Sequence, residues 1–312
     1  MEVCLLSNVR KIASALLIVL FASLMVANLA SAETRTVRDG LGREVSIAGT
    51  PERIVTTIVS TTEIVLDLGV DERLVGVPDL VEYLSYVPEL QEKAEEKEKV
   101  GGFKLSMEKI ASLNPDLVIM DASAQKEAID KIEKMGAAVY ASGSKNLDEV
   151  RESILEIGYL VGNLDRAQEI VGEMAYRKLQ LNEAVRQLED RKKTFYTISQ
   201  RMYTVGSNTF VGRALDLAGL DNVFGDISGY KPVSTEEIVQ RNPELIIATE
   251  DMGLSVEELE KKTGLEKVRA VKEGNVLLLP TGEDSMLNQP GTKIIEGAIN
   301  LFEKVYGKEV GV

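Results

Sequence analysis

The sequence contains no histidine, no tryptophan and a single cysteine, Cys4, among its 312 residues. Without histidine, neither a Ser-His-Asp nor a Cys-His catalytic group can form, and the usual zinc sites are excluded. Haem ligation by histidine, or by cysteine beyond Cys4, is excluded in the same way. A metal could therefore be held only by Asp, Glu, Tyr or Met side chains, or arrive already enclosed in an organic chelate.

The N-terminal segment has the pattern of a secretory signal peptide. Basic residues precede an apolar run over residues 12–29, and Ala30-Ser31-Ala32 then supplies the small residues of a cleavage site. We expect residues 1–32 to be removed and the rest to be exported to the periplasm or cell surface; a retained anchor is the alternative. Because Cys4 lies before the apolar run, we expect a mature chain without thiol or cysteine-linked lipid.

The overall composition is that of an acidic globular protein. The formal net charge is −14, which argues against nucleic acid as a partner because such binders need a basic surface. The hydrophobic content of 44% supports substantial cores, and the length suits one large or two medium domains. No stretch after the leader is long enough to span a bilayer.

One stretch occurs twice in the chain, at residues 106–119 and 234–247. Each copy has a serine, an acidic residue two positions later, an Asn-Pro pair and then an aliphatic run. The serine is a helix N-cap, and Ser234 with Glu237 forms the pattern of a capping box. The Asn-Pro pair ends the helix, and the aliphatic run predicts a buried strand. A repeated helix–turn–strand unit predicts two lobes built alike.

Strand-like and helix-like segments alternate on both sides of a long helical segment, which predicts parallel sheets. Expected elements include a hairpin over residues 35–47, a helix capped by Ser60-Thr61-Thr62-Glu63, a helix over 124–135, and loops over 80–99 and 281–290. The fold class predicted is α/β, with two Rossmann-like lobes. The lobes are predicted at residues 33–162 and 194–312.

Residues 163–193 contain no proline and one glycine, and their apolar residues recur at three- and four-residue spacing. This predicts one helix of roughly 45 Å, at ~1.5 Å per residue, which is longer than one small domain needs. A sustained heptad is missing, so a coiled coil is not indicated. We therefore expect a rigid helix that connects the two lobes.

Several motifs in this order resemble the substrate-binding proteins of ABC importers for cobalamin, iron–siderophore complexes and haem. They are Asp39-Gly-Leu-Gly-Arg43, Pro51-Glu-Arg-Ile-Val55, Val100-Gly-Gly-Phe103, both copies of the repeat, and Gly206-Ser-Asn-Thr-Phe-Val-Gly212. The resemblance covers essentially the whole mature chain. It implies two α/β lobes joined by one long helix, a ligand in the cleft between them, modest closure on binding, and an ABC permease dimer as partner.

The candidate ligand-binding residues are aromatic or basic and lie in loops near strand ends or the repeats. The aromatic ones could grip a flat ligand, and the basic ones would favour an anionic chelate in so acidic a chain. They are Tyr83, Phe103, Lys104, Arg201, Tyr203, Tyr230 and Lys231. No catalytic residue, metal ligand or resident cofactor is expected, and the protein is expected to be a monomer.

Glu108 and Glu236 occupy the same place in the two copies of the repeat. An acidic residue in a first helical turn interacts favourably with the helix dipole, which would be a purely structural role. The resemblance implies a second role, because the matching glutamates of that family contact arginines on the two permease subunits.

The expected function is to capture a metal chelate and deliver it to a permease. A ferric siderophore-type chelate is placed first, cobalamin second and haem third. Direct binding of bare ferric iron by tyrosinate and carboxylate ligands is a rival. A secreted enzyme or cofactor-insertion protein on the same fold is the alternative from another class.

Overall fold

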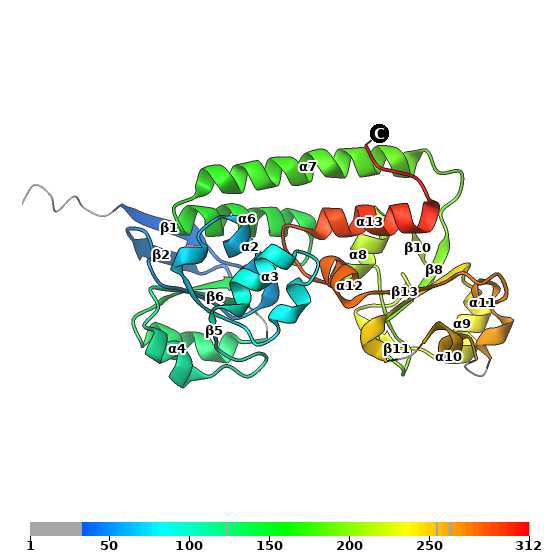
Figure 1. Ribbon diagram of the computed structural model, residues 1–312, viewed down its shortest axis with the longest axis horizontal. Helices are drawn as coiled ribbons and strands as arrows, with labels where there is room; N and C mark the ends of the chain where they lie inside the picture. The colour runs from blue at the N-terminus through cyan, green and yellow to red at the C-terminus, as the bar shows by residue number, and fades with distance from the viewer. Residues whose placement is uncertain (1–32, 123, 254, 262–263, 312) are drawn as a thin grey trace, which may run out of the picture.

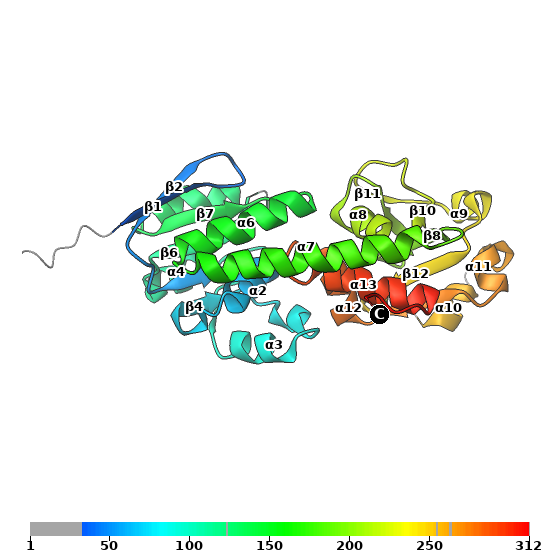
Figure 2. The ribbon, with the colours of Figure 1, turned by 90° about the horizontal axis from the view of Figure 1, so that it is seen from above.

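The computed structural model describes residues 33–311, except residues 123, 254, 262 and 263. The predicted signal peptide, residues 1–32, lies outside the described residues. Figure 1 shows two α/β lobes side by side along the long axis, with helix α7 (Leu164–Arg186) running over both of them. Figure 2, seen from above, shows the same helix crossing from one lobe to the other.

The first lobe is built on a five-stranded parallel sheet with the order β5-β4-β3-β6-β7. Its central strands are continuous runs of buried aliphatic residues, as expected for a sheet covered on both faces. The strands are β3 (Ile54–Thr56), β4 (Leu74–Val77), β5 (Glu98–Lys99), β6 (Leu117–Asp121) and β7 (Ala138–Ser142). The helices are α2 (Val59–Asp67), α3 (Pro88–Glu95), α4 (Met107–Leu113), α5 (Ile129–Glu133) and α6 (Leu147–Leu160).

The second lobe repeats this plan with a four-stranded parallel sheet, in the order β10-β8-β12-β13. A separate antiparallel ribbon joins β9 and β11. The strands are β8 (Lys193–Thr197), β9 (Tyr203–Val205), β10 (Asp221–Asn222), β11 (Tyr230–Pro232), β12 (Leu245–Thr249) and β13 (Val276–Leu279). The helices are α8 (Phe210–Leu217), α9 (Thr235–Arg241), α10 (Val256–Glu260), α11 (Arg269–Lys272), α12 (Thr281–Asn288) and α13 (Ile294–Tyr306). The two parallel sheets confirm the predicted fold class.

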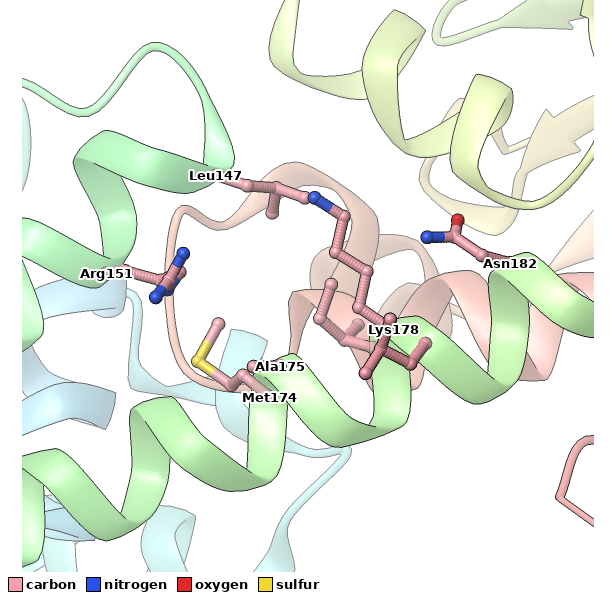
Figure 3. A pocket seen from close by; sticks show the side chains of 8 residues that line it. Leu147, Arg151, Met174, Ala175, Lys178 and Asn182 are labelled. Carbon is pink, nitrogen blue, oxygen red and sulfur yellow. The ribbon is translucent and has the colours of Figure 1, made fainter.

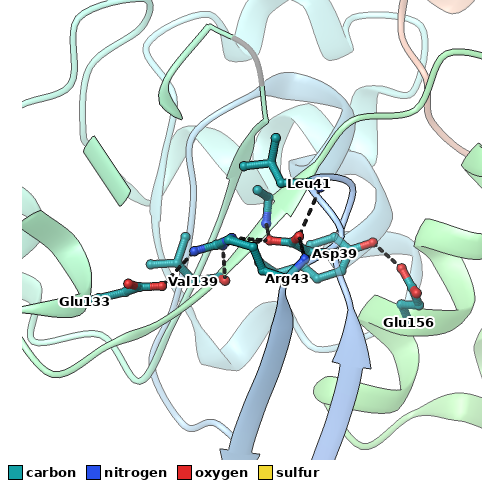
Figure 4. A network of polar contacts seen from close by, with 8 residues as sticks. Asp39, Leu41, Arg43, Glu133, Val139 and Glu156 are labelled. Carbon is teal, nitrogen blue, oxygen red and sulfur yellow. Dashed lines mark hydrogen bonds and ion pairs between the residues drawn. The ribbon is translucent and has the colours of Figure 1, made fainter. Parts of the chain in front are cut away.

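The opening hairpin pairs β1 (Thr34–Arg38) with β2 (Glu44–Ala48), and its turn is fixed to the first lobe by Asp39. The buried Asp39 carboxylate accepts bonds from the Leu41 and Arg43 backbone N–H groups at 3.0 and 2.9 Å, and from the Arg43 guanidinium at 2.6 Å. Arg43 continues the network to Glu133 at 2.8 Å and to the Val139 carbonyl at 3.0 Å (Figure 4). The Asp-Gly-Leu-Gly-Arg motif is therefore a structural clamp.

The connecting helix is shorter than the sequence predicted. α7 has 23 residues, about 34 Å at ~1.5 Å per residue, and ends at Arg186 instead of continuing to residue 193. Lys193 already pairs in β8 with Asp221 of β10, so the chain has to leave the helical path before that point. The polar residues 189–192 form this turn.

Four other local predictions were wrong. The segment Ser60 to Glu63 does not cap a helix, because α2 begins at Val59 and these side chains are buried within it. The predicted loop over residues 281–290 contains α12, and the predicted irregular segment over 80–99 contains α3. Residues 124–135 form only a short 3₁₀ turn followed by α5. Burial against neighbouring elements decided each of these cases, and local propensity did not.

The two copies of the repeat adopt the same local structure. Ser106 and Ser234 both cap their helices, and Ser234 forms the predicted capping box with Glu237. The helices end at Asn114 and Asn242, which have left-handed backbones with φ of 45° and 44°. Asparagine tolerates this region better than most residues, which explains why it precedes the proline in both copies.

Candidate ligand-binding cleft

A cavity of about 180 Å³ lies where the first lobe faces the second. Most of its wall comes from loops at the carboxyl ends of β3, β4 and β6, where ligands bind in open α/β sheets. The second lobe contributes Gln289, which follows α12. The other lining residues are Thr57, Ile58, Val59, Pro78, Leu80, Gly102, Phe103, Asp121, Ala124 and Gln125.

Gln125 fixes the floor of this cavity. Its side-chain oxygen accepts a bond from the Thr57 hydroxyl at 2.5 Å and from the Asp121 backbone N–H at 3.2 Å. Its amide group donates to the Gly102 carbonyl at 3.2 Å. One buried side chain thus connects three loops, including the one that carries Phe103. Nothing in the sequence pattern around Gln125 singled it out.

On the second lobe, α12 carries a buried carboxyl near the cleft, that of Asp284. It accepts hydrogen bonds from the Tyr196 hydroxyl and, at 2.6 Å, from the Asn288 amide. Burial, followed by the neighbouring carboxylate of Asp251, raises the pKa of Asp284 to about 6, against an ordinary value of 3.8. An aspartate at this position therefore changes its charge near neutral pH.

The four predicted aromatic residues differ in their settings. Phe103 is 88% exposed beside the first-lobe cavity. Tyr203 and Tyr230 are exposed on the β9–β11 ribbon of the second lobe. Tyr83 is half-buried against the main hydrophobic core, and burial, followed by the charge of Asp251 in the second lobe, raises its pKa.

The predicted basic residues lie beside these aromatic ones. Lys104 follows Phe103 in the same loop, Arg201 lies in the turn before β9, and Lys231 is the middle residue of β11. All three are exposed, and none forms an ion pair within the described part of the chain. Residues 201, 203, 230 and 231 thus gather on one ribbon of the second lobe, whereas 103 and 104 share one loop of the first.

A buried polar junction connects the lobes behind the cleft. Glu63 of α2 accepts bonds from the Tyr86 hydroxyl, from the Thr292 hydroxyl at 2.7 Å and from the Lys293 backbone N–H at 3.0 Å. The same Thr292 hydroxyl also contacts a carboxylate oxygen of Asp67, so its single hydrogen is shared between the two acidic residues, and the Lys293 ammonium pairs with Asp67 at 2.8 Å. Burial, opposed by these hydrogen bonds, raises the pKa of Glu63.

The two acidic residues expected to meet a permease are on the surface, one in each lobe. Glu108 is in the first turn of α4 and Glu236 in the first turn of α9, and both are exposed. Figure 1 shows α4 and α9 on the side of the molecule away from α7. Glu237, by contrast, is held by the Ser234 backbone N–H at 2.8 Å as part of the capping box.

No group of three or more Asp or Glu residues in the described part of the chain is arranged to hold a metal ion. Among the same residues, no helix is long and apolar enough to cross a membrane.

Two α/β lobes, one connecting helix and a cleft at the facing strand ends define a two-lobed solute-binding protein. The pattern of the periplasmic binding protein family matches residues 54–282, so the chain belongs to that family. This confirms the predicted resemblance: the protein is a solute-binding protein of the ABC importer class that handles cobalamin, siderophore and haem ligands.

The relatives agree with this assignment over most of the chain. An uncharacterised ABC transporter substrate-binding lipoprotein of Bacillus subtilis, YvrC, is 29% identical over 87% of this chain and 85% of its own. A cobalamin-binding protein of Halobacterium salinarum is 27% identical over 84% of this chain and 71% of its own. A possible iron-binding periplasmic protein of Staphylococcus epidermidis superposes with a TM-score of 0.70 at 28% identity, covering 82% of this chain and 99% of its own.

Proposed function

We propose that this protein captures a metal chelate in the cleft between its lobes, outside the cytoplasmic membrane, and delivers it to an ABC permease. The observation that carries the proposal is the exposure of aromatic side chains on both lobes, with Phe103 on one side and Tyr203 and Tyr230 on the other. Solvent-exposed rings cost free energy unless a ligand covers them, and ring faces suit a large flat ligand.

The cavity of about 180 Å³ is smaller than the roughly 300–1,000 Å³ of ordinary small-molecule pockets. A chelate would therefore also occupy the open space toward the β9–β11 ribbon. A cobalamin-type corrinoid is the first ligand to test, because a relative matched over most of the chain is named as a cobalamin-binding protein. An anionic ferric siderophore is the second, because Lys104, Arg201 and Lys231 are exposed and unpaired within the described residues.

Calorimetric titration of the purified protein with cyanocobalamin, a ferric tris-catecholate chelate, haemin and ferric citrate would test this proposal. One of the chelates is expected to bind with one-to-one stoichiometry. Phe103→Ala and Tyr230→Ala should each weaken that ligand about tenfold, as expected when a central aromatic contact is removed. Tyr176→Ala is the matched control, because Tyr176 is an exposed tyrosine on α7. Equal effects of all three substitutions, or no binding of any chelate, would contradict the proposed site.

The permease contact is proposed at Glu108 and Glu236. Exposed ion pairs contribute little free energy, so the two acidic residues would orient the encounter and increase its rate. A Glu108→Ala/Glu236→Ala variant should keep its chelate affinity and lose transport in reconstituted vesicles. Its deficit relative to the wild type should shrink at high salt, where the ion pairs of the wild type are themselves screened. Glu257→Ala, which removes an exposed first-turn acid of α10, is the control. Full transport by the double variant would leave both residues with a role in helix stability alone.

A further inference from the structure

A second cavity, of about 310 Å³, lies beneath α7 and shares no lining residue with the cleft cavity. Its wall combines α6 of the first lobe, the middle of α7 and the first turn of α13 of the second lobe. Figure 3 shows Leu147 and Arg151 of α6 and Met174 of α7 around the same open space, with Lys178 extending across it toward Leu147. The volume is in the range of small-molecule pockets.

The interior of this α7 pocket is apolar. Leu147, Met174, Ala175, Leu179 and Ile295 supply its hydrophobic surface. Leu179, in α7, is 67% exposed. An aliphatic chain of about the pocket's volume would remove this surface from water. Burying apolar surface stabilises a complex by roughly 25 cal/mol per Å².

The charged groups at the pocket are all positive. Lys178 and Arg151 line it together with Asn182, and no acidic residue does. Lys178 forms no ion pair among the described residues, and Arg151 pairs with Asp148 only at 3.5 Å, with both side chains well exposed. Such an exposed pair is weak, so the guanidinium remains available to another anion. In a chain of net charge −14, an apolar pocket with two cations and no carboxylate selects for an anionic ligand.

We propose that the α7 pocket binds a small anionic amphiphile, a medium-chain aliphatic carboxylate. The chain would lie against Met174, Leu179 and Ile295, and the carboxylate would meet Lys178 and Arg151. A carboxylate can accept hydrogen bonds from both of these groups at once. The site is separate from the proposed chelate site, so its occupancy does not depend on which chelate the cleft takes.

The test is a calorimetric titration of the purified protein with decanoate, below its aggregation concentration, alongside 1-decanol and acetate. Decanoate is expected to bind one-to-one. Decanol lacks the carboxylate and acetate lacks the aliphatic chain, so both should bind about tenfold more weakly or worse. Lys178→Gln should weaken decanoate about tenfold and leave decanol binding unchanged. Arg186→Gln, at the end of the same helix and outside the pocket, is the matched control.

Two further variants distinguish the α7 pocket from the cleft and from an interface between two copies of the chain. Phe103→Ala should leave decanoate affinity unchanged, since Phe103 lines only the cleft cavity. Equal affinity for decanoate and decanol, a loss in Phe103→Ala, or no saturable binding would overturn the proposal. So would a dimer, detected by light scattering, that Leu179→Ser dissociates, because a second copy would then be the occupant of the pocket. Lys178 and Leu179 are not core residues, so the variants are expected to fold, which circular dichroism would verify.

Discussion

Replacing Asp284 by asparagine should change the pH dependence of stability in a way that identifies this one carboxyl. Its folded-state pKa is about 6, whereas an ordinary aspartate titrates at 3.8. Because the folded state binds this proton more tightly than the unfolded state does, the group destabilises the fold progressively as pH rises from about 4 to about 6. A carboxyl paired with a cation would have a lowered pKa in the folded state, and it would stabilise the fold as pH rises.

The magnitude follows from the difference between the two pKa values. About two units correspond to roughly 2–3 kcal/mol, at ~1.4 kcal/mol per unit, all of it present above pH 6. Asparagine removes the charge and can still accept the bond from Tyr196, but the Asn288 amide must turn to pair with it. That rearrangement costs on the order of 1 kcal/mol. Asp284→Asn should therefore stabilise the protein by about 1–2 kcal/mol at pH 7 and destabilise it slightly at pH 4.

Urea unfolding of the wild type and the variant from pH 4 to pH 8 would measure this difference. The difference in unfolding free energy should change sign between pH 4 and pH 7, with its midpoint near pH 5. Asp190→Asn, at an exposed position, is the control and should give a nearly constant difference. Parallel curves for wild type and Asp284→Asn would refute the reasoning, because they would mean that the buried carboxyl titrates alike in the folded and unfolded states.

Substitutions at three further positions test other parts of the structure by urea or thermal unfolding. Gly291→Ala should destabilise by about 1–3 kcal/mol, because the new methyl group would lie 2.4 Å from a carboxylate oxygen of the buried Glu63; an unchanged midpoint would contradict this packing. Asp39→Ala should cost about 1–3 kcal/mol by leaving Arg43 and two backbone N–H groups without their acceptor, and wild-type stability would show that the clamp is dispensable. Asn114→Ala should cost about 1 kcal/mol and Asn114→Gly almost nothing, and equal costs would argue against the left-handed cap.

The fold could be predicted from the sequence because its signals are local and repeated. Each copy of the Ser-to-Asn-Pro stretch contains its own cap, stop and strand, so the same local rules predict the same unit in both lobes. The periodicity of the long helix predicted α7, although its end depended on where Lys193 joins the sheet. α12 was missed because Thr281 to Asn288 is mostly polar, and its helix is stabilised by packing against α13 and α8.

The candidate site was predicted less completely, because buried polar groups have no periodic signal. Phe103 could be found as an aromatic residue after a Gly-Gly pair, and it does line the cleft cavity. Gln125 and Asp284 could not, since each owes its role to partners 68 and 88 residues away in the chain. Their importance appears only when the loops of a lobe are brought together.

The junction at Glu63 bears on how the lobes can move. α7 is the predicted rigid connection between the lobes, and the lobes are also joined at Thr292 and Lys293, which bond to Glu63 and Asp67 over 2.7 to 3.0 Å. Opening the cleft widely would expose a buried carboxylate and break these bonds, each worth about 1 kcal/mol or more. A small rotation about the junction keeps them. A stiff helix and a buried polar contact both lie behind the cleft, so we expect only modest movement of the lobes around this junction.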